Sequence, residues 1–181
     1  MAVLPIIVAP DPRLKDVAAA VERVDDEVRQ LMDDMLETMY QAPGIGLAAP
    51  QVGVPKRVLV VDASKDPKNK EPQRMANPEL VSVSDEDSSH EEGCLSLPDQ
   101  FAEVVRPARI RVRYLDYEGE LREMDTDGLL ATCIQHEVDH LDGILFVDHI
   151  SALKRNMILR RLTKMKKAGK VPAVTAAANA M

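Results

Sequence analysis

The chain has 181 residues, of which 45% are hydrophobic and 29% are charged, and its formal net charge is −7. This length fits one domain, and no apolar run approaches the roughly 18 residues that a membrane-spanning helix requires. A net acidic chain does not favour general nucleic-acid binding, so DNA is not an expected partner. Early prolines and an aspartate argue against an N-terminal signal peptide, and we expect a soluble cytoplasmic protein.

The N-terminal half is expected to form one helix, one buried strand and one long loop. Residues 25–41 place apolar side chains at helical spacing and begin with acidic residues, which favours an amphipathic helix. Residues 56–62 contain a short run of β-branched residues typical of a buried strand. Residues 63–78 are polar and contain three prolines, so they predict a solvated loop.

Strands and a hairpin are expected in the middle of the chain. Residues 80–83 and 102–105 are short strand candidates. In residues 108–116 the side chains of Ile, Val and Tyr alternate with arginines, which indicates one buried face and one exposed face. A turn then leads into residues 121–124, so these two strands predict an antiparallel hairpin.

Two further helices are expected towards the C-terminus. Residues 126–141 have helical spacing, with a cap signal at their start and a glycine after their end, and residues 151–167 form a second, strongly basic helix. We predict a single α+β domain over residues 1–168, in which antiparallel strands surround the central helix. Residues 169–181 are expected to be a disordered tail.

The central helix carries the motif His136-Glu137-Val138-Asp139-His140. Residues four apart lie on one helical face, roughly 6 Å apart along the axis, so both imidazoles can bind one metal ion. Glu137 lies beside that site and can act as a general base. A motif of this kind also occurs by chance on a solvated helix face, but two of only four histidines fall in it, which favours a function.

A catalytic site needs a third protein ligand and an open position for water. Metalloproteases with a third histidine would place it at position 146, which is Phe146, and those that use a later glutamate are excluded because no glutamate follows Glu137. Cys133 shares the face of His136 but lies roughly 10 Å from His140 along the helix axis, which is too far for one compact site. We interpret Cys133 as a core or pocket-lining thiol.

Three side chains are left as candidates for the third ligand. Asp148 and His149 lie beyond the end of the helix and take second place. Cys94 is preferred, because Gly93 permits an unusual backbone angle before it and Pro98 limits strand pairing after it, as expected of a ligand at a strand end.

Three segments together resemble the signature motifs of the peptide deformylases, in the order of that family. They are GIGLAAPQ at 44–51, EGCLSLP at 92–98 and QHEVDHLDG at 135–143. The resemblance extends over nearly the whole chain. It implies hydrolysis of the N-formyl group from the N-terminal methionine of newly synthesised polypeptides, with release of formate.

The resemblance also implies roles for individual residues. Cys94, His136 and His140 would bind one divalent metal ion, Fe(II) first, with zinc, nickel and cobalt also compatible. Glu137 would handle the proton. Three other residues would contact the substrate. Gln51, through its side-chain amide, and Leu95, through its backbone N–H, would stabilise the oxyanion. Gly46 would contact the peptide backbone.

The walls of the methionine pocket follow less directly from the motifs. The candidates are Ile45, Glu92, His90, Phe101 and Cys133. Family members often carry arginine at the position of Phe101, so a guanidinium contact to the substrate is missing or replaced here. We interpret His90 as an ordinary exposed loop histidine, and Asp139 and Asp142 either as partners that orient an imidazole or as solvated helix residues.

The basic helix of residues 151–167 belongs to a segment with eight Lys and Arg and no acidic residue. The resemblance implies docking of this helix on the ribosome, and we expect a monomer without membrane contact. Two other functions are weighed: a peptidase or amidase that uses the same site, and a non-catalytic metal-binding or ribosome-associated module. Glu137 and Gln51 argue against the module, because a structural metal site needs neither.

Overall fold

The computed structural model describes residues 1–171, in which three α-helices form where helical spacing predicts them. The helices are α1 (Asp26–Gln41), α2 (Gly128–Leu141) and α3 (Ala152–Lys167). Asp25 caps α1 by accepting a hydrogen bond from the Val28 N–H, and Ser151 caps α3 by accepting one from the Lys154 N–H. The starts of α1 and α3 therefore follow from capping side chains that are visible in the sequence, whereas Asp127 before α2 makes no capping hydrogen bond through its side chain.

Within the described part of the chain, seven strands form two antiparallel sheets. They are β1 (Gly46–Ala48), β2 (Val58–Val61), β3 (Gln73–Val83), β4 (Asp87–Cys94), β5 (Leu97–Pro107), β6 (Arg109–Leu115) and β7 (Leu121–Asp127). One sheet has the strand order β1-β2-β3-β6-β7, and the other is the β4–β5 hairpin. Short 3₁₀ helices, η1 (Pro12–Lys15), η2 (Ala49–Val52) and η3 (Phe146–His149), connect these elements.

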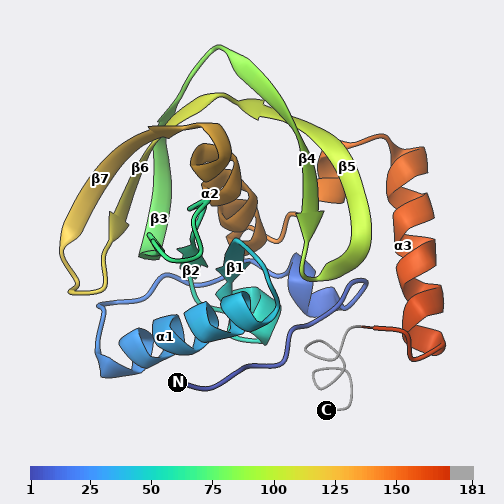
Figure 1. Cartoon of the computed structure of the whole chain (residues 1–181), viewed down its shortest axis with the longest axis horizontal. Helices are drawn as coiled ribbons and strands as arrows, with labels where there is room; N and C mark the ends of the chain where they lie inside the picture. Colours follow the sequence, from blue (N-terminus) through green and yellow to red (C-terminus); the bar gives the residue numbers. More distant parts are fainter. Residues whose placement is uncertain (172–181) are drawn as a thin grey trace.

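The helix α2 lies at the centre, between the five-stranded sheet and the β4–β5 hairpin, and α3 lies along the outer side of that hairpin (Figure 1). This arrangement confirms the predicted α+β domain with antiparallel strands around the helix that carries both histidines. The predicted β6–β7 hairpin is also confirmed, with Arg109 paired to Asp127 and Leu115 paired to Leu121.

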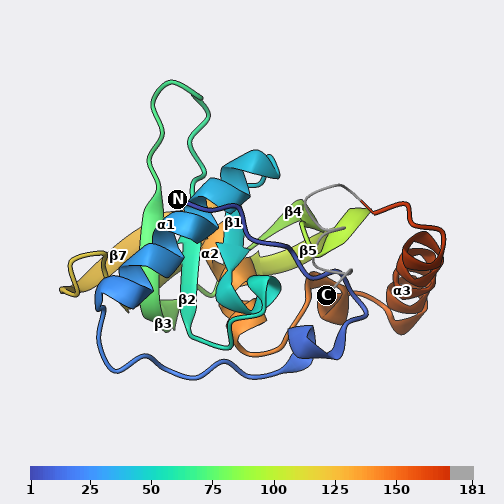
Figure 2. The same ribbon diagram turned by 90° about the horizontal axis from the view of Figure 1, so that it is seen from below.

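The predicted loop over residues 63–78 is wrong at its C-terminal end. Only residues 63–72 project from the body between β2 and β3 (Figure 2), because β3 already begins at Gln73. Asn77 adopts a φ of 48° and the register of β3 against β6 shifts after Ala76, so the strand passes Pro78 through an irregularity. The candidates at 80–83 and 102–105 are parts of the longer strands β3 and β5.

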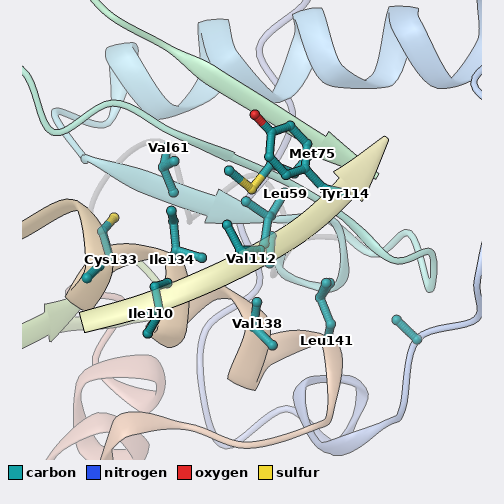
Figure 3. Packing of buried hydrophobic residues seen from close by; sticks show 13 residues of the cluster. Leu59, Val61, Met75, Ile110, Val112, Tyr114, Cys133, Ile134, Val138 and Leu141 are labelled. Carbon is teal, nitrogen blue, oxygen red and sulfur yellow. The ribbon is translucent and has the colours of Figure 1, made fainter. Parts of the chain in front are cut away.

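The strand β2 explains how the core is organised. Its four residues are fully buried, because Leu59 and Val61 face α2 while Val58 and Val60 face α1. In Figure 3 the α2 side chains of Ile134 and Val138 lie against Leu59, Val61 and the neighbouring strands. The five-stranded sheet therefore holds α2 in place from one side, and the position of the two histidines follows from this packing.

A third apolar cluster joins the N-terminal segment and β5 to α3, through Ile7, Leu97, Phe146, Ile158 and Leu162 among others. Among residues 1–171 there is no helix that is long and apolar enough to cross a membrane. The expected tail at 169–181 lies largely outside the described residues, so its disorder stays a prediction.

Candidate metal centre

Cys94, His136 and His140 lie together, as the sequence predicts for a metal site. One donor atom from each residue lies within 4.8 Å of the others, and the Sγ atom of Cys94 is 3.3 Å from Nε2 of His140. Among the histidine, cysteine and acidic residues within residues 1–171, these three have donor atoms close enough together to hold one metal ion. A thiol and two buried imidazoles at these separations fit a divalent cation with affinity for sulfur and nitrogen ligands.

The three side chains reach this place from two different elements. His136 and His140 occupy one face of α2, and their ring centroids are 5.0 Å apart. Cys94 ends β4, where the register against β5 shifts, so that Gly93 pairs with Phe101 but Cys94 pairs with Leu97. This irregularity turns the end of β4 towards α2.

The other sequence candidates for the third ligand lie outside this group. The Cys133 thiol donates a hydrogen bond to the Ile45 carbonyl oxygen, and burial raises its pKa well above the usual value, so the thiol stays protonated. Asp148 pairs with Lys15 and Arg155, and His149 contacts Asp139. Among the sequence candidates for the third ligand, Cys94 is therefore the one that lies with His136 and His140.

A buried ion pair next to His136 was not predicted from the sequence. Glu92 accepts hydrogen bonds from Nε and Nη2 of Arg106 at 2.6 and 2.9 Å, and its Oε1 atom is 2.9 Å from Nδ1 of His136. Burial alone would raise the pKa of Glu92, but the hydrogen bonds from Arg106 and His136 outweigh it and lower that pKa to about 2. The ionised Glu92 accepts a hydrogen bond from the Nδ1–H group of His136, and this leaves the Nε2 lone pair free for a metal.

Arg106 has a detectable signature in the sequence. It follows Val104 by two residues in β5, and both side chains are buried, so a charged residue stands at an inward position of an alternating strand. Such a residue requires a buried partner of opposite charge. The pattern predicts that partner without identifying it as Glu92.

Asp139 belongs to the same network, while Asp142 does not. Asp139 accepts hydrogen bonds from Nη1 of Arg106 and from His149, so it supports the buried ion pair from the side of α2. Asp142 pairs with Arg57 at 2.9 Å. Neither carboxylate orients the His140 ring directly.

Glu137 is buried beside the three ligands, with 4% of its surface exposed, and its Oε2 atom has no hydrogen-bond partner among the described residues. Burial raises the pKa of the carboxyl group to about 7 against the opposing charge of His136. A cation at the neighbouring ligands would counteract that burial effect. The carboxyl group can therefore exist in both protonation states near neutral pH.

Gly46 leaves the space that Glu137 occupies. A Cβ atom at position 46 would lie 2.5 Å from Oε1 of Glu137 and 2.9 Å from Sγ of Cys133, closer than any real Cβ contact. The backbone of β1 can approach α2 this closely only because residue 46 has no side chain. This contact places the start of β1 at the site.

Gln51, in η2, is held by both ends of its amide. Its Oε1 atom accepts the Ala48 N–H at 2.9 Å, and Nε2 donates to Ser96 Oγ at 3.0 Å and to Cys94 Sγ at 3.5 Å. Ser96, which is fully buried, was not predicted as a site residue. Gln51 thus presents an amide nitrogen to the metal ligands in a fixed orientation.

A cavity of about 660 Å³ opens onto this site. Its walls include Cys94, His136, Glu137 and all the residues that the sequence analysis assigned to substrate contact other than Gln51: Ile45, Gly46, Glu92, Leu95, Phe101 and Cys133. The interpretation of His90 as an exposed loop residue is wrong. His90 lies within β4, is half-buried, pairs with Val104 and also lines the cavity.

Comparison with known proteins agrees with this geometry. The family model of polypeptide deformylase matches residues 3–156. A peptide deformylase of Phenylobacterium zucineum is 56% identical over 168 residues, which cover 93% of this chain and 99% of that protein.

Solved structures agree as well. The peptide deformylase of Ehrlichia chaffeensis in complex with actinonin has a TM-score of 0.88 and 43% identity, and the match covers 92% of this chain and 99% of that one. A Met-Ala-Ser-bound peptide deformylase of Acinetobacter baumannii has a TM-score of 0.78 and 41% identity, over 82% and 99%. The chain therefore belongs to the polypeptide deformylase family, the hydrolases that remove the N-formyl group from nascent peptides.

Proposed function

We propose that this chain deformylates peptides at one divalent metal ion held by Cys94, His136 and His140. The proximity of these three donors beside the unpartnered Oε2 atom of Glu137 carries the proposal. When bound, such an ion supplies a Lewis acid that polarises a carbonyl group and lowers the pKa of water. Ferrous iron is the proposed metal, and zinc, nickel and cobalt are compatible with the same ligands.

Glu137 moves the proton in this proposal. Its Oε2 atom accepts a proton from the attacking water and then donates it to the amine nitrogen that leaves when the formyl C–N bond breaks. The products are formate and a peptide with a free N-terminal methionine. The buried position of Glu137 keeps the carboxyl group away from bulk water, and this supports its role in both transfers.

Gln51 and Leu95 are proposed to stabilise the charge that develops on the formyl oxygen. The Nε2 atom of Gln51 is fixed at 3.5 Å from Cys94 Sγ, and Leu95 follows Cys94 in the chain and lines the cavity. Donors fixed before the reaction stabilise such a charge without reorganisation, and the loss of one typically costs about 10²–10³ in kcat.

The peptide is proposed to lie in the cavity, with its backbone at Gly46 and its methionine side chain among Ile45, Glu92, Phe101 and Cys133. The tripeptide named for the Acinetobacter baumannii relative, Met-Ala-Ser, has the composition of a deformylated product. It supports formyl-Met-Ala-Ser as the test substrate for this chain.

The first experiment measures formate released from formyl-Met-Ala-Ser by anaerobically purified protein, with the bound metal quantified in the same sample. Acetyl-Met-Ala-Ser and an internal peptide serve as controls, because a general amidase or peptidase would cleave them. We expect formate only from the formyl peptide, and a loss of about 10²–10⁴ in rate for Glu137→Gln with the metal retained. Metal binding without formate release by the wild type would disprove the substrate assignment.

The helix α3 is proposed to dock a monomeric enzyme on ribosomal RNA in the cytoplasm. Ile158 and Leu162 are buried against the domain, while six basic side chains are exposed: Lys154, Arg160, Arg161, Lys164, Lys167 and Lys170. Arg155 and Lys166 are used within the domain, by Asp148 and by the Val8 carbonyl oxygen. The exposed set supports a contact with phosphate groups.

Cosedimentation with purified ribosomes tests this docking. The double change Arg160→Glu and Arg161→Glu is expected to weaken binding and to reduce its dependence on salt. The double change Lys65→Glu and Lys68→Glu, in the projecting loop, alters the net charge by the same amount and is the matched control. Equal binding by both variants would contradict docking through α3.

A further inference from the structure

His149, one of the sequence candidates for the third metal ligand, lies at the outer end of a chain of polar contacts. Its Nε2 atom is 2.8 Å from Oδ2 of Asp139, and the same oxygen accepts a hydrogen bond from Nη1 of Arg106 at 2.8 Å. Arg106 holds Glu92 through two hydrogen bonds, and Oε1 of Glu92 is 2.9 Å from Nδ1 of His136. An unbroken series of contacts therefore leads from η3 to a proposed metal ligand on α2.

Exposure to solvent increases along this series of contacts. The side chains of Glu92 and Arg106 are each 5% exposed. The side chain of Asp139 is 20% exposed and that of His149 is 35% exposed. His149 therefore supplies the outermost protein donor to the Asp139 carboxylate, at the point where the network meets water. Because a buried charge keeps its position only while its partners satisfy it, the loss of this outer donor should loosen the inner ion pair.

The segment that carries His149 is fixed beside the metal ligands by contacts of its own. The ring of Phe146 stacks on that of His136, with the centroids 6.1 Å apart and the planes at 25°. Asp148 pairs with basic side chains of η1 and α3. A purely structural role for His149, as one more contact that holds η3, can therefore be tested separately at the neighbouring Asp148.

We propose that His149 is a positioning residue of the metal centre, which holds the His136 ring through the three intervening side chains so that Nε2 is directed at the metal. This inference rests on the proposed function, in which His136 binds the ion. The group required at position 149 is an N–H donor at the place of Nε2, and a neutral imidazole can supply it as well as a charged one. His149 is outside the cavity wall formed by the described residues, so no direct contact with the substrate is proposed.

The test measures the affinity for Co(II) by competition with a chelator, in the wild type and in two variants of His149. His149→Phe keeps a ring but removes the donor, and we expect the affinity to fall about 3–10-fold, less than the roughly 10–100-fold typical of a partner that touches the ligand directly. His149→Gln places an amide N–H near the position of Nε2 and should bring the affinity to within about twofold of the wild type. The visible absorption of bound Co(II), which reports the geometry of its ligands, should shift in His149→Phe and not in His149→Gln.

Asp148→Asn is the matched control, because it removes ion pairs of the same 3₁₀ helix but leaves the series of contacts intact. It should change neither the affinity for Co(II) nor the spectrum. In a Glu92→Gln background the link to His136 is already weakened, so His149→Phe should then have little further effect on the affinity.

Three outcomes would overturn the inference: wild-type affinity in His149→Phe, a loss that His149→Gln does not restore, or an equal loss in Asp148→Asn. Metal binding is measured without peptide, so a wild type that binds Co(II) but releases no formate would refute the proposed substrate and not the role of His149. A wild type that binds no metal would refute the proposed metal centre, and the inference would fall with it.

Discussion

Glu92 orients His136, a proposed metal ligand, through a hydrogen bond at Nδ1, and it lies outside the group of the three proposed ligands. In Glu92→Gln the Nδ1 proton of His136 loses an ionised acceptor, and Arg106 loses the charge that offsets its own burial. We expect the affinity for the metal to fall about 10–100-fold, as is usual when such a partner is removed. Competition against a chelator of known affinity measures this change.

The control for that prediction is Glu103→Gln. Glu103 is an exposed acid on β5, and its carboxylate accepts a hydrogen bond from the Ser89 hydroxyl group. The change alters the charge of the same hairpin by the same amount. If Glu92→Gln and Glu103→Gln bind the metal equally well, Glu92 does not position His136.

Gly46 is expected to be intolerant of even one added carbon. In Gly46→Ala the new methyl group must displace the Glu137 carboxylate or the Cys133 thiol, so we expect kcat to fall by about 10²-fold, since misplacement of a catalytic group by about 1 Å costs that much. The metal content should not change. In a Glu137→Ala background the same substitution should cost much less, and full additivity of the two effects would count against the contact.

The site could be predicted from sequence only where its chemistry is local. His136 and His140 are four residues apart on one helix, so their shared face follows from helical geometry. Cys94 lies 42 residues before His136, so helical geometry does not connect the two. Its choice as third ligand over Asp148 and His149 depended on the neighbouring Gly93 and Pro98 and on the resemblance to the peptide deformylases. Arg106 was missed because nothing in its local sequence identifies Glu92 as its partner.

Among the elements, η1, η3 and α3 are joined by one carboxylate. Asp148 accepts hydrogen bonds from the side chains of Lys15 and Arg155 and from the Leu145 N–H. Burial alone would raise the pKa of Asp148, but these hydrogen bonds outweigh it, so folding lowers that pKa below the ordinary 3.8.

The sign of the pH dependence follows from this direction. A carboxyl group whose pKa is lowered by folding stabilises the folded state above its unfolded pKa, and that contribution is lost as the pH falls below about 3.8. We expect Asp148→Asn to lower the free energy of unfolding by about 1 kcal/mol at pH 7, after allowance for solvent screening of the partly exposed partners. Urea unfolding at pH 7, 5 and 4 should show the difference from wild type beginning to shrink at the lowest pH.

Asp85→Asn, at an exposed position between β3 and β4, is the control for the same series. It should leave the free energy of unfolding nearly unchanged throughout. A difference for Asp148→Asn that grows as the pH falls would contradict the direction of the pKa shift.

Elements with a clear periodicity were predictable, and polar strands were not. The spacing of apolar residues in α1 and the alternation in β6 each specify one buried face. The strand β4 has the sequence DSSHEEGC, which carries no apolar alternation, because its inward residues are polar groups of the site. Tertiary pairing with β5 makes it a strand, and no local signal records that pairing.

For the molecule as a whole, the proposed metal ligands come from parts of the chain that belong to two separate sheets. Cys94 belongs to the β4–β5 hairpin, whereas His136 and His140 belong to the helix that packs on the five-stranded sheet. An ion bound at these three residues would therefore stabilise the contact between the two parts. At free metal 100-fold above Kd we expect about 2.7 kcal/mol of added stability, or roughly 5–10 °C in Tm.

Differential scanning calorimetry with and without a chelator checks this expectation. Cys94→Ala removes one ligand, and its Tm should respond much less to the metal than that of the wild type. An equal response in both proteins would show that the stabilising ion binds elsewhere. A wild-type Tm that does not respond to the chelator would contradict the stabilising link between the two sheets.

The five-stranded sheet ends at β1 on one side and at β7 on the other. The edge at β1 is three residues long and buried, so it offers little backbone to the sheet of a second protein molecule. The edge at β7 is long, but it carries Glu123 and Asp125, which pair with arginines of β6. Short and charged edges both oppose strand-to-strand association between molecules. The protein should therefore resist aggregation through this sheet even when it is highly concentrated.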